Sequence, residues 1–220
     1  MQSTLYNKNR RTNGTQKMRD YTQVDRYLNE LADDIYPQPP DEPNTGHDKA
    51  ITHIGDNWLS KISSSSLKSV LDVGCGQGVA LHMLSRYAKR VEGVTLGNDA
   101  DIAGKLGYTV HRSDMSFLPY NDKEFNLIFS RHSIEHSPMP LLTLMEWYRV
   151  SSQWLMMIVP DVEHYAPYGL NHYSVLTIDQ WKTLLDRAGW HVIWIDRYEP
   201  IWEIRFFCEK KVRKNLCLDE

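Results

Sequence analysis

The strongest constraint on the fold of this chain is a regular alternation of strand and helix patterns that begins after Ser66. Apolar runs predict strands at 69–75, 90–96, 109–114, 125–133 and 154–160. Amphipathic segments predict helices at 79–88, 98–107, 141–151 and 177–189. Thr177 is suited to cap the start of the last helix and Gly189 to end it. Two further strand patterns, at 191–200 and 201–211, follow each other directly and predict an antiparallel pair.

Alternating strands and helices are typical of α/β proteins, because neighbouring parallel strands need a crossover connection, usually a helix. The continuous apolar character of 69–75 indicates a strand that is buried on both faces. We therefore predict an α/β, Rossmann-like fold: a seven-stranded, mainly parallel sheet with helices on both faces and an N-terminal helical cap. In such a fold, ligands bind at the carboxyl ends of the strands.

The chain before the alternating region has a different character. Apolar side chains recur at helical spacing from Tyr21 to Ile35, and a second helical pattern covers 47–62, so this part predicts a helical cap. His47 and His53 could reach a pocket beneath the cap, although solvent exposure is the simpler expectation. We predict four parts: a mobile polar tail at 1–19, the cap at 20–66, the α/β domain at 67–212 and a short tail at 213–220.

Bulk composition narrows the function classes. The 220 residues carry a formal net charge of −3 and are 41% hydrophobic, which is ordinary for a globular domain. An acidic balance disfavours nucleic-acid binding, which usually needs a basic surface. Cys75, Cys208 and Cys217 form no paired motif, and no apolar run approaches the length of a membrane span. We therefore expect a cytoplasmic protein.

A glycine-rich turn joins the first strand to the first helix of the α/β region, with the sequence Leu-Asp-Val-Gly-Cys-Gly-Gln-Gly at 71–78. Glycine lets the backbone approach a ligand closely and adopt positive φ, but the same pattern also fits a turn that only packs helix on strand. Two details favour the ligand. Asp72 precedes Gly74 by two residues, and the helix-opening glycine of the dinucleotide pattern GxGxxG is missing.

From about Val70 to Gly189 the chain resembles the class I S-adenosylmethionine-dependent methyltransferases. Within them it is similar to the small-molecule, methyltransferase type 11 group that includes enzymes of ubiquinone and menaquinone biosynthesis. The resemblance implies methyl transfer with S-adenosyl-L-methionine as cofactor. It also implies that Asp72 lies near the cofactor's ammonium group and that its methionine end is held by Gly74, Cys75 and Gly76.

The second strand departs from the family pattern. It usually ends in an acid that binds both ribose hydroxyls, and here Thr95 stands in that place, followed by Leu96. The stretch resembles the cyclopropane-fatty-acid synthases, which use the same cofactor, so we keep Thr95 and Leu96 as cofactor-binding residues. We expect Asp99, or else Asn98 or Asp101, to supply the ribose acceptor. The alternative is that these residues only favour a helix N-terminus.

A third block, Ser-Asp-Met-Ser-Phe-Leu-Pro-Tyr at 113–120, is similar to the family segment that follows the third strand. The resemblance implies that Asp114 accepts a hydrogen bond from the adenine amino group. It also implies that the backbone N–H of Met115 meets an adenine ring nitrogen. The alternative is an aspartate that ends a strand at a turn.

The chemistry is expected just after the fourth strand, at 130–136. Methyl transfer is an in-line displacement, so the protein must align the acceptor, exclude water and, for a hydroxyl, remove a proton. Histidine titrates in the right range, which makes His132 and His136 the candidate catalytic residues. The resemblance places Arg131 and His132 at the methyl end of the cofactor. His136 follows Glu135 in a recurring pair that could equally serve packing.

Further histidines and acids follow the fourth and fifth strands, whose loops adjoin in this fold. We therefore consider a divalent metal held by His136, Asp161 and His172. Related ubiquinone-pathway enzymes carry a Glu-x-x-Glu-His metal motif in the matching segment, and His132 stands at its first position here. The alternative is a polar acceptor pocket without metal.

Three functions compete. We favour methyl transfer to an oxygen or nitrogen of a small-molecule acceptor, by a monomer or a homodimer. The first alternative is a macromolecular acceptor, a glycan, protein or nucleic acid. Against DNA amino methylation, Ser-Arg-His-Ser at 130–133 stands where a (D/N/S)-P-P-(Y/F/W) motif would be needed. The second alternative is a non-catalytic cofactor-binding module, and the intact glycine and adenine motifs weigh against it.

Overall fold

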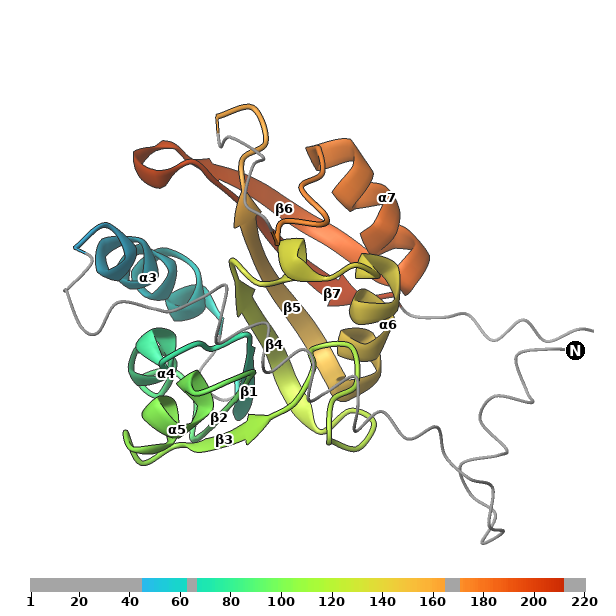
Figure 1. Ribbon diagram of the computed structural model, residues 1–220. Helices are drawn as coiled ribbons and strands as arrows, with labels where there is room; N and C mark the ends of the chain where they lie inside the picture. The colour runs from blue at the N-terminus through green and yellow to red at the C-terminus, as the bar shows by residue number, and fades with distance from the viewer. Residues whose placement is uncertain (1–44, 63–66, 165–170, 212–220) are drawn as a thin grey trace, which may run out of the picture.

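Seven strands form one sheet in the part of the chain that the structure describes. The structure is a computed structural model, and it describes residues 45–62, 67–164 and 171–211. The strands are β1 (Ser69–Val73), β2 (Arg90–Thr95), β3 (Thr109–Arg112), β4 (Phe125–Arg131), β5 (Ser151–Pro160), β6 (Trp190–Tyr198) and β7 (Glu203–Lys210). Their order across the sheet is β3-β2-β1-β4-β5-β7-β6 (Figure 1).

The sheet is parallel from β3 through β5 and antiparallel at its other end. β7 pairs antiparallel with both β5 and β6, so the last strand of the chain lies inside the sheet. The remaining neighbours all pair in parallel. These pairings confirm the predicted mainly parallel sheet and the antiparallel pair at the end of the chain.

Helices cover both faces of the sheet (Figure 1). One face carries α3 (Thr45–Asn57), α4 (Val79–Leu84) and α5 (Asp99–Gly104). The other face carries α6 (Pro140–Val150) and α7 (Ile178–Ala188). Short 3-10 turns are η1 (Leu59–Lys61), η2 (Ile134–His136) and η3 (Glu199–Ile201). The predicted α/β architecture is confirmed.

An apolar layer on each face holds these elements together. On the side of α6 and α7, Trp147, Trp181 and Trp190 are at most 1% exposed. On the opposite side, Ile54 of α3 packs in one cluster with strand residues such as Phe129. Each fully buried side chain of this kind contributes roughly 1.5–3 kcal/mol. This packing on both faces stabilises the sheet, which holds the loops at its edge in place.

The ends of α7 follow directly from local sequence. The Thr177 hydroxyl accepts a hydrogen bond from the Gln180 backbone N–H, and the Gln180 side chain accepts one from the Thr177 N–H. This reciprocal pair satisfies two donors that a helix start leaves open. Gly189 ends the helix at φ 102°, a conformation that favours glycine. The predicted cap and stop of this helix are both present.

The N-terminal helical cap, predicted at 20–66, lies only partly within the described residues. The helix expected at 47–62 forms as α3 followed by η1. The tails at 1–19 and 213–220, and the helix expected from Tyr21 to Ile35, lie outside the described ranges. Within those ranges, every helix is too short or too polar to cross a membrane.

The carboxyl ends of the parallel strands bring distant segments to one edge of the sheet. The glycine-rich turn follows β1 at this edge, and η2 follows β4. Because β7 runs the other way, its first residue reaches the same edge, and Glu203 lies opposite Pro160 at the end of β5. The candidate site is built from these loop and strand ends.

Candidate functional site

The glycine-rich turn leaves β1 with three glycines in the left-handed region of φ. Gly74, Gly76 and Gly78 have φ values of 78°, 51° and 88°. The backbone N–H groups of Gly74 and Cys75 both donate to the Val94 carbonyl, at 2.8 and 3.0 Å. These two bonds fix the turn against the end of β2. Any contact of the first two turn residues with a ligand must therefore come from groups other than these N–H donors.

The glycines differ in what surrounds them. A Cβ on Gly74 would lie 1.9 Å from the Ser133 Oγ, so Gly74 is required for the packing of the turn against the loop after β4. A Cβ on Gly76 would meet only Asp99 Oδ2, at 3.7 Å, so the space in front of Gly76 is open. Gly76 is therefore the turn residue whose missing side chain leaves room for a ligand.

Asp72 is the next-to-last residue of β1, two residues before Gly74, and is 2% exposed. Its Oδ2 atom has no hydrogen-bond partner among the described residues. Burial raises the pKa of Asp72 to about 7, although the nearby Arg131 guanidinium pulls it down. A buried carboxylate with an open acceptor fits a cationic ligand group, which is what the ammonium of S-adenosylmethionine would provide.

The ribose side of the predicted site is occupied by the turn and the start of α5. The Cys75 side chain points into the apolar packing against Gly93, where a Cβ would be 2.6 Å from its sulfur, so only the backbone of Cys75 could face a ligand. Thr95 uses its carbonyl to accept from the Ser113 N–H at 3.2 Å, and Leu96 follows at the half-buried end of β2.

Of the three residues expected to replace the ribose acid, the geometry favours one. Asp101 is paired with Arg112 at 2.8 Å and its side chain is 70% exposed. Asn98 is exposed. Asp99 is half-buried and faces the open side of Gly76, and its charge also acts on the Cys75 thiol, whose pKa is raised mainly by burial.

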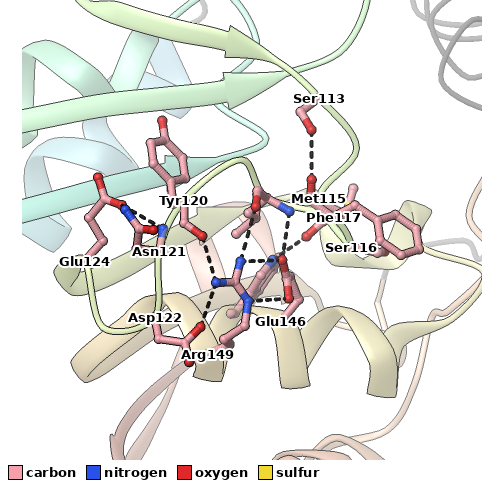
Figure 2. A network of polar contacts seen from close by, with 12 residues as sticks. Ser113, Met115, Ser116, Phe117, Tyr120, Asn121, Asp122, Glu124, Glu146 and Arg149 are labelled. Carbon is pink, nitrogen blue, oxygen red and sulfur yellow. Dashed lines mark hydrogen bonds and ion pairs between the residues drawn. The ribbon is translucent and has the colours of Figure 1, made fainter. Parts of the chain in front are cut away.

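The loop between β3 and β4 carries Asp114 and Met115, the predicted adenine-binding residues. Asp114 Oδ1 accepts from the Ser116 backbone N–H at 2.8 Å, which closes a tight local turn. The Met115 carbonyl accepts from the Trp147 indole N–H at 3.0 Å. Side chains of α6 hold the rest of the loop, and Figure 2 shows Arg149 at the centre of that network.

A buried charge network follows β4 at the same edge. Arg131 Nε lies 2.6 Å from Glu203 Oε1, and Arg205 Nη2 lies 2.9 Å from Glu203 Oε2. Glu203 and Arg205 are both fully buried. Burial alone would raise the pKa of Glu203, but the cations around it lower the pKa to about 2. Arg131, expected to bind cofactor, is thus directed toward β7.

His132 sits between two buried carboxylates. Its Nε2 lies 2.9 Å from Glu203 Oε1 and its Nδ1 lies 3.4 Å from Glu135 Oε1. Burial alone would lower the pKa of His132, but the two carboxylates outweigh it and raise the pKa. The imidazolium form is therefore favoured. His132 also adopts a φ of 50°, which is uncommon for a residue other than glycine.

His136, at the end of η2, has a different environment. Its Nδ1 lies 3.1 Å from the Asn171 carbonyl, which can only accept, so Nδ1 carries the proton. Its Nε2 lies 4.0 Å from Glu135 Oε1. Burial lowers the pKa of His136, so the neutral imidazole is favoured. The ring of His172 lies beside it, with the two centroids 4.8 Å apart.

The structure brings together two of the three predicted metal ligands. Ligand atoms of Glu135, His136 and His172 lie within 4.8 Å of one another, and both Glu135 oxygens lack a hydrogen bond within the described residues. Asp161 lies elsewhere, because Arg197 holds its carboxylate at 3.0 Å and His164 at 3.2 Å. The geometry therefore replaces Asp161 with Glu135 in the candidate ligand set.

Sequence reasoning missed three members of the charge network. Glu203 and Arg205 carry a usable signal, since two charged residues interrupt an otherwise apolar strand pattern in the sequence EIRFF. His53 was expected to be solvent-exposed, and it is half-buried instead. Its Nδ1 accepts from Arg205 Nη1 at 2.8 Å, so α3 is tied to the network.

Comparisons with known proteins concern the domain and its fold. Residues 71–153 match the sequence family described as "Methyltransferase domain". This segment contains the glycine-rich turn, the loop between β3 and β4, and η2. Residues 71–153 of this chain therefore carry a methyltransferase domain.

Solved structures resemble this methyltransferase domain in fold. The magnesium protoporphyrin IX methyltransferase from Synechocystis with bound S-adenosylhomocysteine is 12% identical, with a TM-score of 0.64 over 87% of this chain and 100% of that one. A SAM-dependent methyltransferase from Aquifex aeolicus is 20% identical, with a TM-score of 0.57 over 77% of this chain and 100% of that one. The cyclase SpnF is 16% identical, with a TM-score of 0.65 over 87% of this chain and 94% of that one.

Proposed function

We propose that this methyltransferase transfers a methyl group from S-adenosylmethionine to an oxygen or nitrogen of a small-molecule acceptor. The observation that carries the proposal is the placement of the His136 imidazole, whose Nδ1 lies 3.1 Å from the Asn171 carbonyl and whose Nε2 lies 4.0 Å from buried Glu135. It follows β4 at the edge where Asp72 and the glycine turn lie. A net charge of −3 favours a small molecule over nucleic acid as the acceptor.

The residues of the cofactor site divide by the part of the cofactor they would hold. S-adenosylmethionine, when bound, supplies an electrophilic methyl group on a sulfonium. Asp72 would accept from its ammonium group, and the open space at Gly76 would admit its methionine end. Asp99 would accept from the ribose, with Thr95 and Leu96 beside it. Asp114 and the Met115 N–H would recognise adenine.

His136 is the general base of this proposal. Its Nε2 would take the proton that an acceptor hydroxyl or amine loses when the acceptor bonds to the methyl carbon. The carbon–sulfur bond of the cofactor would break in the same displacement, with S-adenosylhomocysteine as the leaving group. The Asn171 carbonyl keeps Nδ1 protonated, so the lone pair stays on Nε2. Glu135, at 4.0 Å, then stabilises the imidazolium that results. His132, with both ring nitrogens facing carboxylates, orients the loop instead of taking a proton.

Radiolabelled S-adenosylmethionine offers a direct test. A cell extract is separated into small-molecule, protein and nucleic-acid fractions, and each fraction is incubated with enzyme and label. We expect label in the small-molecule fraction. His136→Gln should lower the rate by about 10²–10⁴-fold, the usual contribution of a general base, while binding S-adenosylhomocysteine as wild type does. His191→Gln, at an exposed histidine of β6, is the matched control.

Two outcomes would contradict the proposal. Label confined to protein or nucleic acid would identify a macromolecular acceptor. Cofactor binding without transfer to any fraction would favour a non-catalytic binding module.

A divalent metal is the second candidate at the same place. Two imidazoles and a carboxylate suit a transition-metal ion, and Glu135, His136 and His172 bring their ligand atoms within 4.8 Å of one another. A metal there would hold and acidify an acceptor hydroxyl. Zn²⁺ binding measured by calorimetry should then be lost in His172→Gln and kept in Asp161→Asn. If the metal-free protein is active and a chelator does not inhibit it, the metal is ruled out and His136 acts as the general base without it.

We also propose a reducing, cytoplasmic location. Cys75 and Cys208 are both buried as free thiols, and buried free thiols are typical of proteins kept in reducing compartments.

A further inference from the structure

The loop that carries the adenine-binding residues has little regular structure of its own. Between β3 and β4 it runs from 113 to 124 without a helix or strand. Its local bonds close only small turns. The Ser113 hydroxyl donates to the Phe117 carbonyl at 3.0 Å, the Ser116 N–H to Asp114 Oδ1 at 2.8 Å and the Asn121 N–H to Glu124 at 2.7 Å. The position of the loop must therefore be set by contacts from outside it.

Most of those contacts come from one helix, α6. Others come from β2, where Thr95 accepts from the Ser113 N–H and Glu92 accepts from the Tyr120 hydroxyl. The Arg149 guanidinium, on α6, donates to the Tyr120 carbonyl at 2.7 Å and to the Leu118 carbonyl at 3.2 Å (Figure 2). It also reaches Asp122 Oδ1 at 3.0 Å. The contacts to the two carbonyls fix the backbone of the loop whatever its side chains do.

Glu146, one turn earlier on α6, binds both Arg149 and the loop. We call Arg149 and Glu146 together the clamp. Glu146 accepts two bonds from Arg149, at 2.7 and 2.9 Å, and one from the Leu118 N–H at 2.9 Å. Leu118 is thus held at both its N–H and its carbonyl by one ion pair. Glu146 also raises the pKa of Arg149, so the guanidinium stays charged. The Arg149 side chain is 19% exposed and that of Glu146 13%, so solvent competes little for these bonds.

The clamp lies a short distance along the loop from the adenine contacts. Leu118 follows Met115 by three residues, and the Met115 carbonyl is itself bound to Trp147, between the two members of the ion pair. We infer that Arg149, held by Glu146, is a positioning residue that places Asp114 and the Met115 N–H for adenine. The inference rests on the proposed cofactor site.

Lysine cannot replace arginine here. The planar guanidinium presents five donors in a fixed fork, whereas an ammonium group can aim at one or two of these acceptors at a time. Arg149→Lys keeps the charge and the helix but releases part of the loop. Glu146→Gln keeps one acceptor oxygen, which Leu118 N–H and Arg149 Nη2 can share, and loses the acceptor for Arg149 Nε together with the charge. A smaller effect is expected, because Arg149 itself still holds the two loop carbonyls.

The test compares two nucleosides in one assay. S-adenosylhomocysteine carries the 6-amino group that Asp114 would accept from, and S-inosylhomocysteine carries an oxygen instead. Calorimetry should show that wild type prefers the adenine ligand. Arg149→Lys should weaken the binding of S-adenosylhomocysteine by about tenfold, the equivalent of one net hydrogen bond. The affinity for S-inosylhomocysteine should stay nearly unchanged, so that the preference for the adenine ligand is lost. Glu146→Gln should fall between.

Lys211→Met is the matched control, because Lys211 forms an ion pair with Asp186 that ties α7 to the end of β7, away from this loop. It should keep the wild-type preference. An Arg149→Lys variant that keeps the preference, or loses both ligands equally, would overturn the inference, since equal loss reports only general damage. Wild type that binds neither ligand would instead overturn the proposed cofactor site. If Arg149→Lys fails to fold, the same ratio of affinities for the two ligands is measured in Glu146→Gln, and an unchanged ratio there overturns the inference.

Discussion

Gly74 and Ser133 approach so closely that a Cβ on Gly74 would lie 1.9 Å from the Ser133 Oγ and 2.4 Å from its Cβ. The contact joins the turn after β1 to the loop after β4, and Ser133 is 4% exposed. The Ser133 hydroxyl also donates to the Gly74 and Arg131 carbonyls, at 3.3 and 3.1 Å. The glycine-rich turn after β1 and the loop after β4 are therefore one packed unit.

This contact predicts a strong coupling between two substitutions. Gly74→Ala should destabilise the protein by about 3 kcal/mol or more, because overpacking adds to the cost of positive φ. Ser133→Gly alone should be mild. The double variant should recover the overpacking part in urea denaturation, while the cost of φ 78° remains. Additive effects would show that the two residues do not meet.

Asp72 should lower the stability of the protein and strengthen its binding of the cofactor. At pH 8 its buried carboxylate is ionised, because its pKa is about 7. Asp72→Asn should therefore raise the free energy of unfolding by about 2 kcal/mol, the order of a buried unsatisfied group, and weaken S-adenosylhomocysteine. Near pH 6, binding to wild type should release a proton as the ligand ammonium draws out the carboxylate form. Calorimetry in two buffers of different ionisation enthalpy measures this release, and its persistence in Asp72→Asn would contradict the assignment.

Glu203 should be costly to replace. Glu203→Gln would leave Arg131, His132 and Arg205 buried without their shared carboxylate, and breaking a buried pair costs about 3–5 kcal/mol. It should also lower the pKa of His132, which the Glu203 charge raises. Denaturation and NMR titration of His132 check the two effects separately. A loss below about 1 kcal/mol would mean that water enters the network.

His53 predicts a pH dependence of stability. Burial, and then the Arg205 charge, lower its pKa below 6.5, whereas Asp56, Asp196 and Glu203 act the other way. The unfolded chain then binds a proton first, so stability should fall as the pH drops from 6.5 through the lowered pKa. Protonation would also remove the acceptor for Arg205. In His53→Gln this loss should be absent, so the unfolding curves of the two proteins should diverge below pH 6.5. Parallel curves would contradict the contact.

The parts predicted from sequence were those with local signals. Thr177 and Gly189 delimit α7 through caps that lie within one turn of the chain. The apolar runs set the strands, and the spacing of Asp72 from Gly74 identified the turn. Both the type of element and its position follow from a few neighbouring residues in these cases.

The parts that sequence left out depend on the order of strands. Glu203 meets Arg131 and His132 across 72 and 71 residues, and it does so because β7 inserts between β5 and β6. The sequence also could not show that Glu135, and not Asp161, lies near His172, because that too depends on the order of the strands. Asp161 is taken by Arg197 from β6, and no local pattern reports that partner.

The measurement that tests the cofactor site most directly is titration of S-adenosylhomocysteine into wild type, Gly76→Ala and Gly107→Ala. Both glycines have positive φ, at 51° and 88°, and neither Cβ would clash within the protein. Each variant should therefore lose about 1 kcal/mol of stability. We predict that wild type and Gly107→Ala bind with equal affinity and that Gly76→Ala loses binding, because its methyl group occupies the ligand space. Equal binding by Gly76→Ala, or no binding by wild type, would contradict the account.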